Sequence, residues 1–340
     1  MTVAGGAPGL VMATEQTNQP AQQQMQTEEL QIVFVGDIML DKSVGAQIAK
    51  HGVDYPFQKT AAILQQADLT IGNLETSVST RGKAEPKEFA YRSKPETLKG
   101  LTNAGFDVVN LANNHSLDYG MDALFDTIQH LETNQIAWVG AGKKEAEAFA
   151  PYLTTIKGKR IAVLGLSRVL PNRQWFAGKN KPGLAHAYTD EPMLTYVKKA
   201  SEVADITIAV MHWNLEYKDV PEPYARAIAR KLIDSGVDAV VGSHPHSVMG
   251  IEFYKDAPIY YSVGNFVFTT SYNPKGREAI MVKLAFADQD QGIKTSVIPV
   301  KIVNGQPVPM DAAGKKRMIE KLNQISFDAK VDADGVVTKK

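Results

Sequence analysis

The chain alternates between short apolar runs and longer segments whose apolar residues recur at helical spacing. The short runs predict buried strands, the first of them at residues 31–35 and a later one at 237–241. The helical spacing predicts helices at residues 56–67, 95–105, 121–132, 193–202, 221–235 and 312–326. After residue 250, apolar runs follow one another without intervening helices, at 250–254, 259–263, 279–287 and 295–302. This order predicts an α/β fold whose last part is antiparallel.

The ends of the chain differ from its middle. Residues 1–30 are polar and rich in Gln and Thr, which predicts a disordered segment, either a tether or the remnant of a leader. The small-residue pattern before Thr14 is like a signal-peptidase site, but it lacks the basic start and apolar core of a signal peptide. We expect one domain over residues 31–328 and a polar tail at 329–340.

Composition narrows the functional classes. Lys plus Arg and Asp plus Glu each number 37, so the net charge is zero and nothing favours a nucleic-acid partner. The chain has no cysteine, which excludes disulfides, thiolate nucleophiles and zinc fingers. No apolar stretch approaches the roughly 18 residues that indicate a membrane span.

Polar groups of the kind that bind metals follow five predicted strands. They are Asp37; Asn73 and Glu75; Asn114 and His115; His212; and His244 and His246. Ligands of open α/β sheets bind beyond the carboxyl ends of strands. Each group alone has an ordinary explanation, such as a helix cap for Asp37, a turn for Asn114 or a core histidine for His212. Their recurrence at matching positions favours a shared metal centre, in which Pro245 stiffens the loop between two imidazoles.

Six ordered motifs carry a family resemblance. They are G-D-I-M-L, G-N-L-E, L-A-N-N-H-S-L-D-Y-G, H-W-N-L-E-Y, G-S-H-P-H and Y-S-V-G-N-F-V-F, between residues 32 and 302. This order resembles the capsule-synthesis CapA family, the poly-γ-glutamate biosynthesis proteins of CapA/PgsA type, within the calcineurin-like metallophosphoesterase superfamily. The resemblance implies a four-layer α/β/β/α sandwich with its site at the strand ends.

The resemblance also implies roles for individual residues. Asp37 and His246 would bind a first metal, Asn114, His212 and His244 a second, and Glu75 would bridge the two. His115 would be the general acid. The nitrogen and oxygen donors suit one or two ions of Mn, Fe or Zn. Two positions depart from the superfamily pattern: Met39 stands where a histidine is usual, and Glu75 where an aspartate is usual.

Further residues are candidates for substrate binding. They are Asn73, Asn113, Tyr119 and Glu216, although a turn for Asn113 and packing for Tyr119 are the more ordinary accounts of these two residues. A charged loop contains Arg81, Lys83, Lys87, Arg92 and Lys94 with Glu85 and Glu88. Its cations would suit an anionic polymer, but exposed loops are commonly charged without any such role.

Three functions follow from the sequence. The first is an accessory protein of poly-γ-glutamate capsule synthesis or export, outside the cytoplasm at the cell surface or membrane. Its metal site would bind or act on the anionic polymer, with membrane-bound synthesis or export subunits as further partners. The second is an active metal-dependent hydrolase of phosphoesters or another small anionic substrate. The third is a catalytically silent, polymer-binding scaffold.

Overall fold

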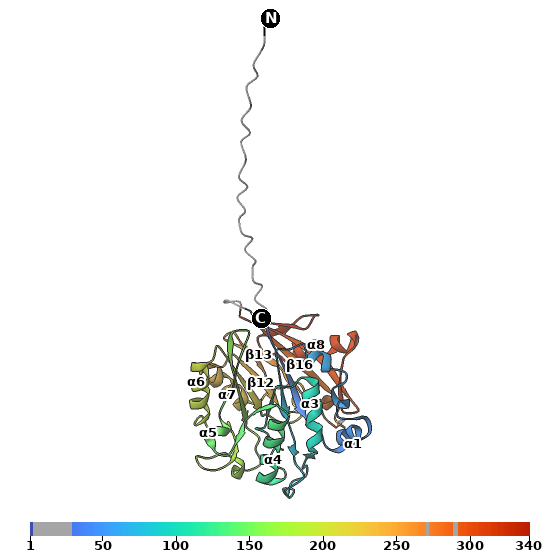
Figure 1. The fold of residues 1–340 in the computed structure, drawn as a ribbon, viewed down its shortest axis with the longest axis vertical. Helices are drawn as coiled ribbons and strands as arrows, with labels where there is room; N and C mark the ends of the chain where they lie inside the picture. Colours follow the sequence, from blue (N-terminus) through green and yellow to red (C-terminus); the bar gives the residue numbers. More distant parts are fainter. Residues whose placement is uncertain (3–28, 270–271, 288–291) are drawn as a thin grey trace.

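The computed structural model describes residues 1–2, 29–269, 272–287 and 292–340. Two β-sheets lie face to face, and helices cover the outer face of each, which gives four layers in the order α/β/β/α (Figure 1). The predicted four-layer sandwich is therefore confirmed. The predicted disordered segment at 1–30 lies almost wholly outside the described residues.

The first sheet combines parallel strands with antiparallel hairpins. In spatial order its strands are β19 (Ala329–Val331), β20 (Val336–Lys339), β17 (Ile293–Val303), β16 (Glu278–Phe286), β1 (Leu30–Ile38), β2 (Leu69–Leu74), β5 (Val108–Asn110) and β6 (Ala137–Val139). The strands from β1 to β6 in this order are parallel, and those from β16 to β19 are antiparallel. Two short strands join it, with β15 (Asn265–Val267) beside the end of β1 and β18 (Gln306–Pro309) beside β17.

The second sheet is parallel at its centre and antiparallel at both edges. Its strands, in spatial order, are β13 (Ile251–Tyr254), β14 (Ala257–Tyr260), β12 (Ala239–Ser243), β11 (Ile206–His212), β9 (Lys159–Ser167) and β8 (Tyr152–Ile156). Two small pairs lie outside both sheets: β3 (Ser77–Val78) with β4 (Arg92–Ser93), and β7 (Ala141–Gly142) with β10 (Gly183–Leu184).

The helices form two outer layers. Against the first sheet lie α1 (Lys42–His51), α2 (Ala61–Leu64), α3 (Leu98–Ala104) and α4 (Gly120–Thr133). Against the second lie α5 (Glu145–Ala148), α6 (Met193–Val203) and α7 (Pro223–Asp234), while α8 (Ala312–Ile325) packs beside β19. Short 3₁₀ turns are η1 (Tyr55–Phe57), η2 (Pro95–Thr97), η3 (Arg173–Trp175) and η4 (Pro274–Arg277). Among the described helices, none is long and apolar enough to span a membrane.

The helices of the structure differ from the predicted ones at two places. The helix expected at 56–67 is split into η1 and α2, because the Thr60 hydroxyl donates to the Phe57 carbonyl and competes with helical hydrogen bonding. Helix α1 was not predicted, because its buried stripe contains only Val44 and Ile48.

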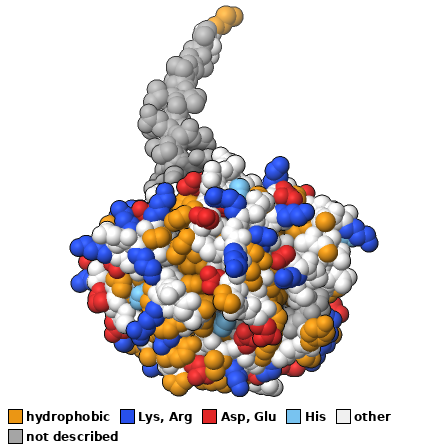
Figure 2. All heavy atoms as spheres, turned by 90° about the horizontal axis from the view of Figure 1, so that it is seen from below, with side chains coloured by type: hydrophobic (Ala, Val, Ile, Leu, Met, Phe, Trp, Pro, Cys, Tyr) orange, Lys and Arg blue, Asp and Glu red, His pale blue; other side chains and the backbone are white. Residues whose placement is uncertain are grey.

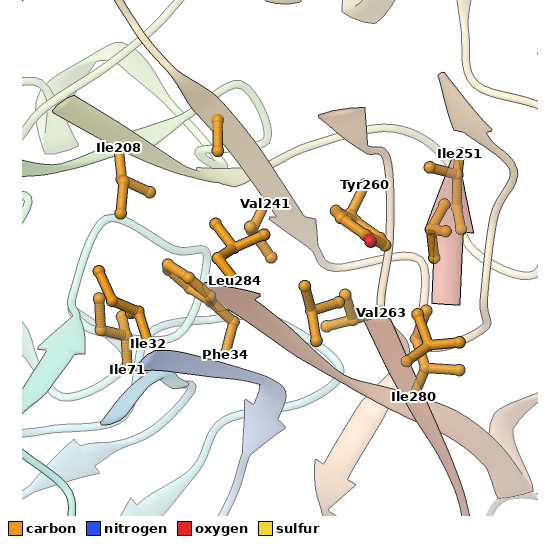
Figure 3. Packing of buried hydrophobic residues seen from close by; sticks show 14 of the residues in the cluster. Ile32, Phe34, Ile71, Ile208, Val241, Ile251, Tyr260, Val263, Ile280 and Leu284 are labelled. Carbon is orange, nitrogen blue, oxygen red and sulfur yellow. The ribbon is translucent and has the colours of Figure 1, made fainter. Parts of the chain in front are cut away.

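The core between the sheets explains the continuous apolar runs of the sequence. Ile32, Phe34 and Ile71 of the first sheet face Ile208 and Val241 of the second (Figure 3). Strands β11 and β12 are buried at every residue because one face meets the opposite sheet and the other meets helices. This double coverage holds the ends of the central strands rigidly in place.

The segment at 329–340 is part of the domain and not a polar tail. It forms the hairpin β19–β20, and Ala329, Val331 and Val337 are buried in the core that also contains residues of α8. In this segment a few apolar side chains alternate with polar ones such as Lys and Asp. Its average composition is therefore polar, although one face of the hairpin is buried.

Neighbouring valines of β20 test this correction. Val337 is 4% exposed and Val336 is 41% exposed. We expect Val337→Asp to lower the free energy of unfolding by about 3 kcal/mol or more, because it buries an unpaired charge. The matched Val336→Asp should cost about 1 kcal/mol or less, since only strand propensity changes. Denaturant unfolding measures both, and equal losses would mean that the segment does not pack as a strand.

Candidate metal centre

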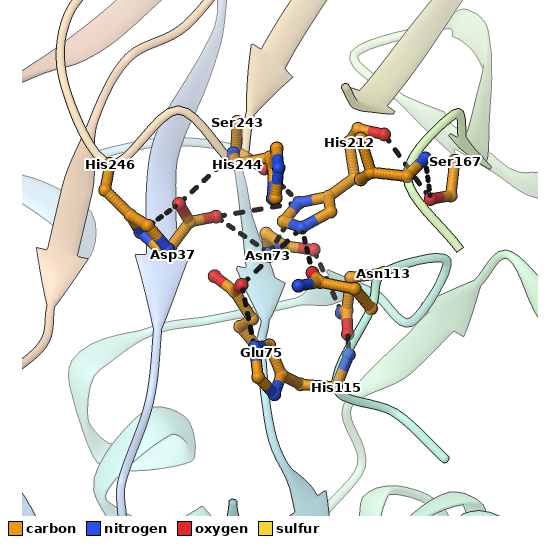
Figure 4. Close-up of polar contacts among 12 residues, drawn as sticks. Asp37, Asn73, Glu75, Asn113, His115, Ser167, His212, Ser243, His244 and His246 are labelled. Atoms are coloured by element: carbon orange, nitrogen blue, oxygen red, sulfur yellow. Dashed lines mark hydrogen bonds and ion pairs between the residues drawn. The ribbon is translucent and has the colours of Figure 1, made fainter. Parts of the chain in front are cut away.

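Strand ends from both sheets converge on one buried cluster. Asp37 lies near the end of strand β1, Glu75 lies directly after β2, and His212 is the last residue of β11. His244 and His246 lie on the loop after β12. Asp37, Glu75 and His212 are fully buried, and the two loop histidines are each 8% exposed. Figure 4 shows the carboxylates of Asp37 and Glu75 among the imidazoles.

The ligand atoms of this cluster form two sets that share one carboxylate. Glu75, His212 and His244 offer atoms within 4.8 Å of one another, and so do Asp37, Glu75 and His246. Glu75 Oε1 lies 3.5 Å from His212 Nε2, and Asp37 Oδ2 lies 3.5 Å from His246 Nδ1. Three protein ligands per set, of nitrogen and oxygen type, suit a divalent metal with an open coordination position.

Unsatisfied atoms provide a test of whether a metal fits here. Both carboxylate oxygens of Glu75 and Nδ1 of His244 are buried without a hydrogen-bond partner in the described part of the chain. A buried, unpaired carboxylate is costly unless a cation compensates for the lost hydration. These three atoms belong to the two ligand sets, so the residues present fit a metal ion.

In the metal-free cluster, the neighbouring charges and burial shift the pKa values of the ionisable groups in opposite directions. Burial and the adjacent Asp37 carboxylate raise the pKa of Glu75 well above its ordinary value. Burial opposes protonation of His246, but the Glu75 and Asp37 carboxylates outweigh it and raise the pKa of His246 to about 10. Burial also opposes ionisation of Asp37, yet His246 and His212 hold the pKa of Asp37 below its usual range. Without a metal, His246 therefore holds a proton at neutral pH, and burial favours the uncharged form of Glu75.

The other two histidines of the cluster are neutral. Burial lowers the pKa of His212 to about 3 and that of His244 well below its ordinary value. Neutral imidazole is the form that binds metals. The Ser243 hydroxyl lies 2.9 Å from His212 Nδ1, and the Asn114 Oδ1 lies 2.8 Å from His212 Nε2. These contacts fix the orientation of the His212 ring.

The loop that carries the other two imidazoles has an unusual backbone. His244 and His246 have φ values of 96° and 53°, a region that non-glycine residues rarely adopt. The backbone N–H of His244 donates to Asp37 Oδ2 at 3.2 Å, and the Pro245 carbonyl accepts from Tyr217 N at 2.8 Å. The first bond ties the loop to strand β1, and the second ties it to the segment that follows β11.

A second feature beside the ligand sets is the pair formed by His115 and Asp118. His115 Nδ1 lies 2.7 Å from Asp118 Oδ2, and its Nε2 lies 3.8 Å from Glu75 Oε1. Lys87 Nζ donates to Asp118 Oδ1 at 2.6 Å and to the Asn114 carbonyl at 2.6 Å. Burial lowers the pKa of His115, although Asp118 acts in the opposite direction. The ring is thus oriented with Nε2 toward the centre.

An asparagine network lies beneath the ligands. Asn73 Nδ2 donates to Asp37 Oδ1 at 2.8 Å, and its Oδ1 accepts from Asn110 and Asn113 at 3.0 and 3.2 Å. Asn113 also accepts from the backbone N–H of His115 at 3.0 Å. Both Asn73 and Asn113 are buried, so their side chains position the ligands and His115 rather than line an open surface.

The remaining sequence candidates lie around the centre rather than in it. Glu216 is exposed and lines a cleft in front of the cluster. The ring of Tyr119 packs under the Arg92 guanidinium, whose central carbon lies 4.2 Å from the ring centroid. Met39 is fully buried, and its sulfur accepts the backbone N–H of Asp41 at 3.2 Å.

Sequence reasoning missed three residues of the site. Asn265 Oδ1 lies 2.8 Å from His246 Nδ1, and Asp118 and Lys87 support His115 as described above. Asn265 follows a glycine within a motif of the family resemblance, which was the available signal. Lys87 belongs to the charged loop, for which a solvated segment was the ordinary interpretation. That interpretation is wrong for Lys87, because its side chain is only 21% exposed.

The four layers place a carboxylate and imidazole cluster at the carboxyl ends of strands, and the residues of this cluster fit a divalent metal. The family model described as "Bacterial capsule synthesis protein PGA_cap" matches residues 31–270. The chain therefore belongs to this family, and the predicted family is confirmed.

Individual relatives agree with this membership. The chain is 33% identical over 310 residues to the "PGA biosynthesis protein CapA" of Bacillus subtilis (strain 168), covering 90% of this chain and 80% of the relative. It is 32% identical over 302 residues to the "Capsule biosynthesis protein CapA" of Bacillus anthracis, covering 86% and 72%. Among solved structures, a 5'-nucleotidase from Candida albicans SC5314 is similar at 12% identity with a TM-score of 0.44, over 79% of this chain and 51% of that one.

The protonation of the metal-free cluster predicts a pH dependence of metal binding. A metal must displace the proton of His246, whose pKa is raised to about 10, so its affinity should rise from pH 6.5 to 8.5 by about tenfold per pH unit for each proton released. Calorimetry with Mn²⁺ in buffers of different ionisation enthalpy counts the protons released. Glu75→Gln removes a carboxylate that raises the pKa of His246, so this variant should release fewer protons. An affinity that is flat over this range would contradict the assigned protonation.

Proposed function

We propose that this chain is a CapA-like accessory protein of poly-γ-glutamate capsule synthesis that binds and hydrolyses the anionic polymer at its metal centre. Membership of the capsule synthesis family and the names of the relatives support the pathway. The observation that carries the chemistry is the Glu75 carboxylate, buried without a partner and shared by two complete ligand sets.

The residues that would hold metal follow from these sets. Asp37, Glu75 and His246 would bind one ion, and Glu75, His212 and His244 a second, with Asn114 as a further oxygen donor beside His212. Manganese, iron or zinc in the divalent state suits this mixture of donors. A bound divalent ion would act as a Lewis acid on a substrate oxygen and lower the pKa of a bound water.

His115 supplies the proton that hydrolysis of a γ-amide requires. In this reaction water adds to the carbonyl carbon, the C–N bond breaks, and the leaving nitrogen takes a proton. With Nδ1 donating to Asp118, the second nitrogen of the ring, Nε2, is directed toward Glu75. It can take the proton that the water loses as it adds to the carbonyl carbon and give that proton to the leaving nitrogen. Burial, which lowers the pKa of His115, makes its protonated form a stronger acid.

The geometry favours this function over a silent scaffold. Met39 stands where a histidine is usual. The first ligand set still has three ligands without a histidine at that position. Two ligand sets and an oriented histidine–aspartate pair are more than polymer binding alone requires. We place the protein at the cell surface, where a capsule is assembled, with membrane-bound synthesis or export subunits as its partners.

Replacement of His115 tests the catalytic part of the proposal. We expect His115→Gln to lower cleavage of γ-linked glutamyl oligomers by about 10²- to 10⁴-fold, while metal content and oligomer binding stay within about twofold. The exposed His51 provides the matched control, since His51→Gln should keep full activity. Mass spectrometry of the Mn²⁺-loaded protein with oligomer, and separately with a set of phosphoesters, measures cleavage. A wild type that cleaves only phosphoesters, or binds oligomer without cleaving it, would contradict the proposal.

A further inference from the structure

A cleft opens onto the metal centre and is lined mainly by aromatic side chains. Its volume is 380 Å³, within the roughly 300–1,000 Å³ range of ligand sites. His115 and His246 form its floor, so a ligand in the cleft reaches the centre directly. Tyr91, Tyr217 and Phe268 form the walls.

The wall rings are packed against the floor histidines. The Tyr91 ring centroid lies 4.3 Å from that of His115, and the Phe268 centroid lies 4.8 Å from that of His246. Tyr91 and Phe268 also meet edge to face at 6.1 Å. This packing gives the cleft fixed apolar walls directly above the ligands of the centre.

The rim of the cleft exposes apolar surface to solvent. Phe89, which lines the cleft, is 56% exposed and lies in a loop that is otherwise highly charged. Tyr272, which also lines the cleft, is fully exposed. Exposed apolar groups gathered at the mouth of a cleft are typical of a ligand-binding groove.

Charge does not explain how this cleft would hold a polyanion. Lys42 and Glu216 line the cleft with opposite charges that offset each other. Over the face shown in Figure 2, basic and acidic side chains are interspersed rather than gathered into a basic tract. An anionic group of a ligand therefore has its best partner at the metal centre on the floor, not along the walls.

We propose that Phe89, Tyr91, Tyr217 and Phe268 recognise the γ-linked backbone of the polymer through its methylene groups, while one α-carboxylate reaches the metal centre. This inference rests on the proposed function. Each γ-glutamyl unit places two consecutive methylenes in the main chain between amides and leaves its carboxylate on a branch. Apolar methylenes suit aromatic walls, and the branched carboxylate can point to the floor or to solvent. Aromatic contact, and not basic side chains, would then select the γ-linkage.

An α-linked glutamyl oligomer is the matched control ligand. It has the same composition and charge as the γ-linked isomer, but its methylenes lie in side chains that end in carboxylates. We expect the Mn²⁺-loaded full chain to bind a γ-linked pentamer about tenfold more tightly than the α-linked one. Because the contact is apolar, raising NaCl from about 0.05 to 0.5 M should weaken γ-pentamer binding by no more than about threefold. Isothermal titration calorimetry measures both effects.

Two matched variants locate the contact. Phe89→Ala should weaken γ-pentamer binding by about five- to tenfold and leave α-pentamer binding and Mn²⁺ content unchanged. Leu153, 54% exposed on the edge strand β8, provides the control, since Leu153→Ala should change nothing. Lys42→Ala should weaken γ-pentamer binding by about twofold at most.

The possible failures are distinguishable. If the metal-loaded wild type binds no γ-pentamer, the proposed function is wrong and this inference with it. If the wild type binds but Phe89→Ala binds equally well, or if α- and γ-pentamers bind alike with a steep loss in salt, only the aromatic recognition is wrong. Tighter binding of adenosine monophosphate than of the γ-pentamer would assign the aromatic walls to a nucleobase instead.

Discussion

The burial of two carboxylates among imidazoles is the constraint on which the site depends. Asp37 and Glu75 are fully buried, and the Glu75 oxygens have no hydrogen-bond donor among the described residues. In the metal-free protein, the proton on His246 and the raised pKa of Glu75 relieve part of the cost. A divalent ion relieves it more completely, because it compensates the carboxylates and uses the unpaired His244 nitrogen as well. Metal binding and the stability of the sandwich are therefore coupled.

The architecture explains how this cost is sustained. Asp37 and Glu75 come from the first sheet, and His212, His244 and His246 from the second, so the centre forms only when the two sheets are packed together. The apolar core between the sheets provides the stabilisation against which the charged cluster is assembled. A cleft with aromatic walls lies directly outside, so the same strand ends position both the centre and the surface that meets a ligand.

Much of the fold and the centre could be predicted from the sequence, for identifiable reasons. Strands β11 and β12 are buried on both faces, which leaves uninterrupted apolar runs, and His212 and His244 follow those runs directly. The support of the centre was less accessible. Lys87 reaches Asp118 and the Asn114 carbonyl only because the charged loop folds back over the strand ends, and no local pattern encodes those contacts. The hairpin at 329–340 was missed because its buried face contains only a few small apolar residues.

The central claim is that Glu75 is shared by metal ions bound between the two sheets. The most direct test is the anomalous scattering of crystals of the protein grown with Mn²⁺, measured for the wild type and for Glu75→Gln. The account predicts a peak about 2 Å from a Glu75 oxygen, with His246 or His212 and His244 as the other ligands, and loss or strong weakening of that peak in the variant. Manganese bound elsewhere, or bound equally well without the Glu75 carboxylate, would contradict it.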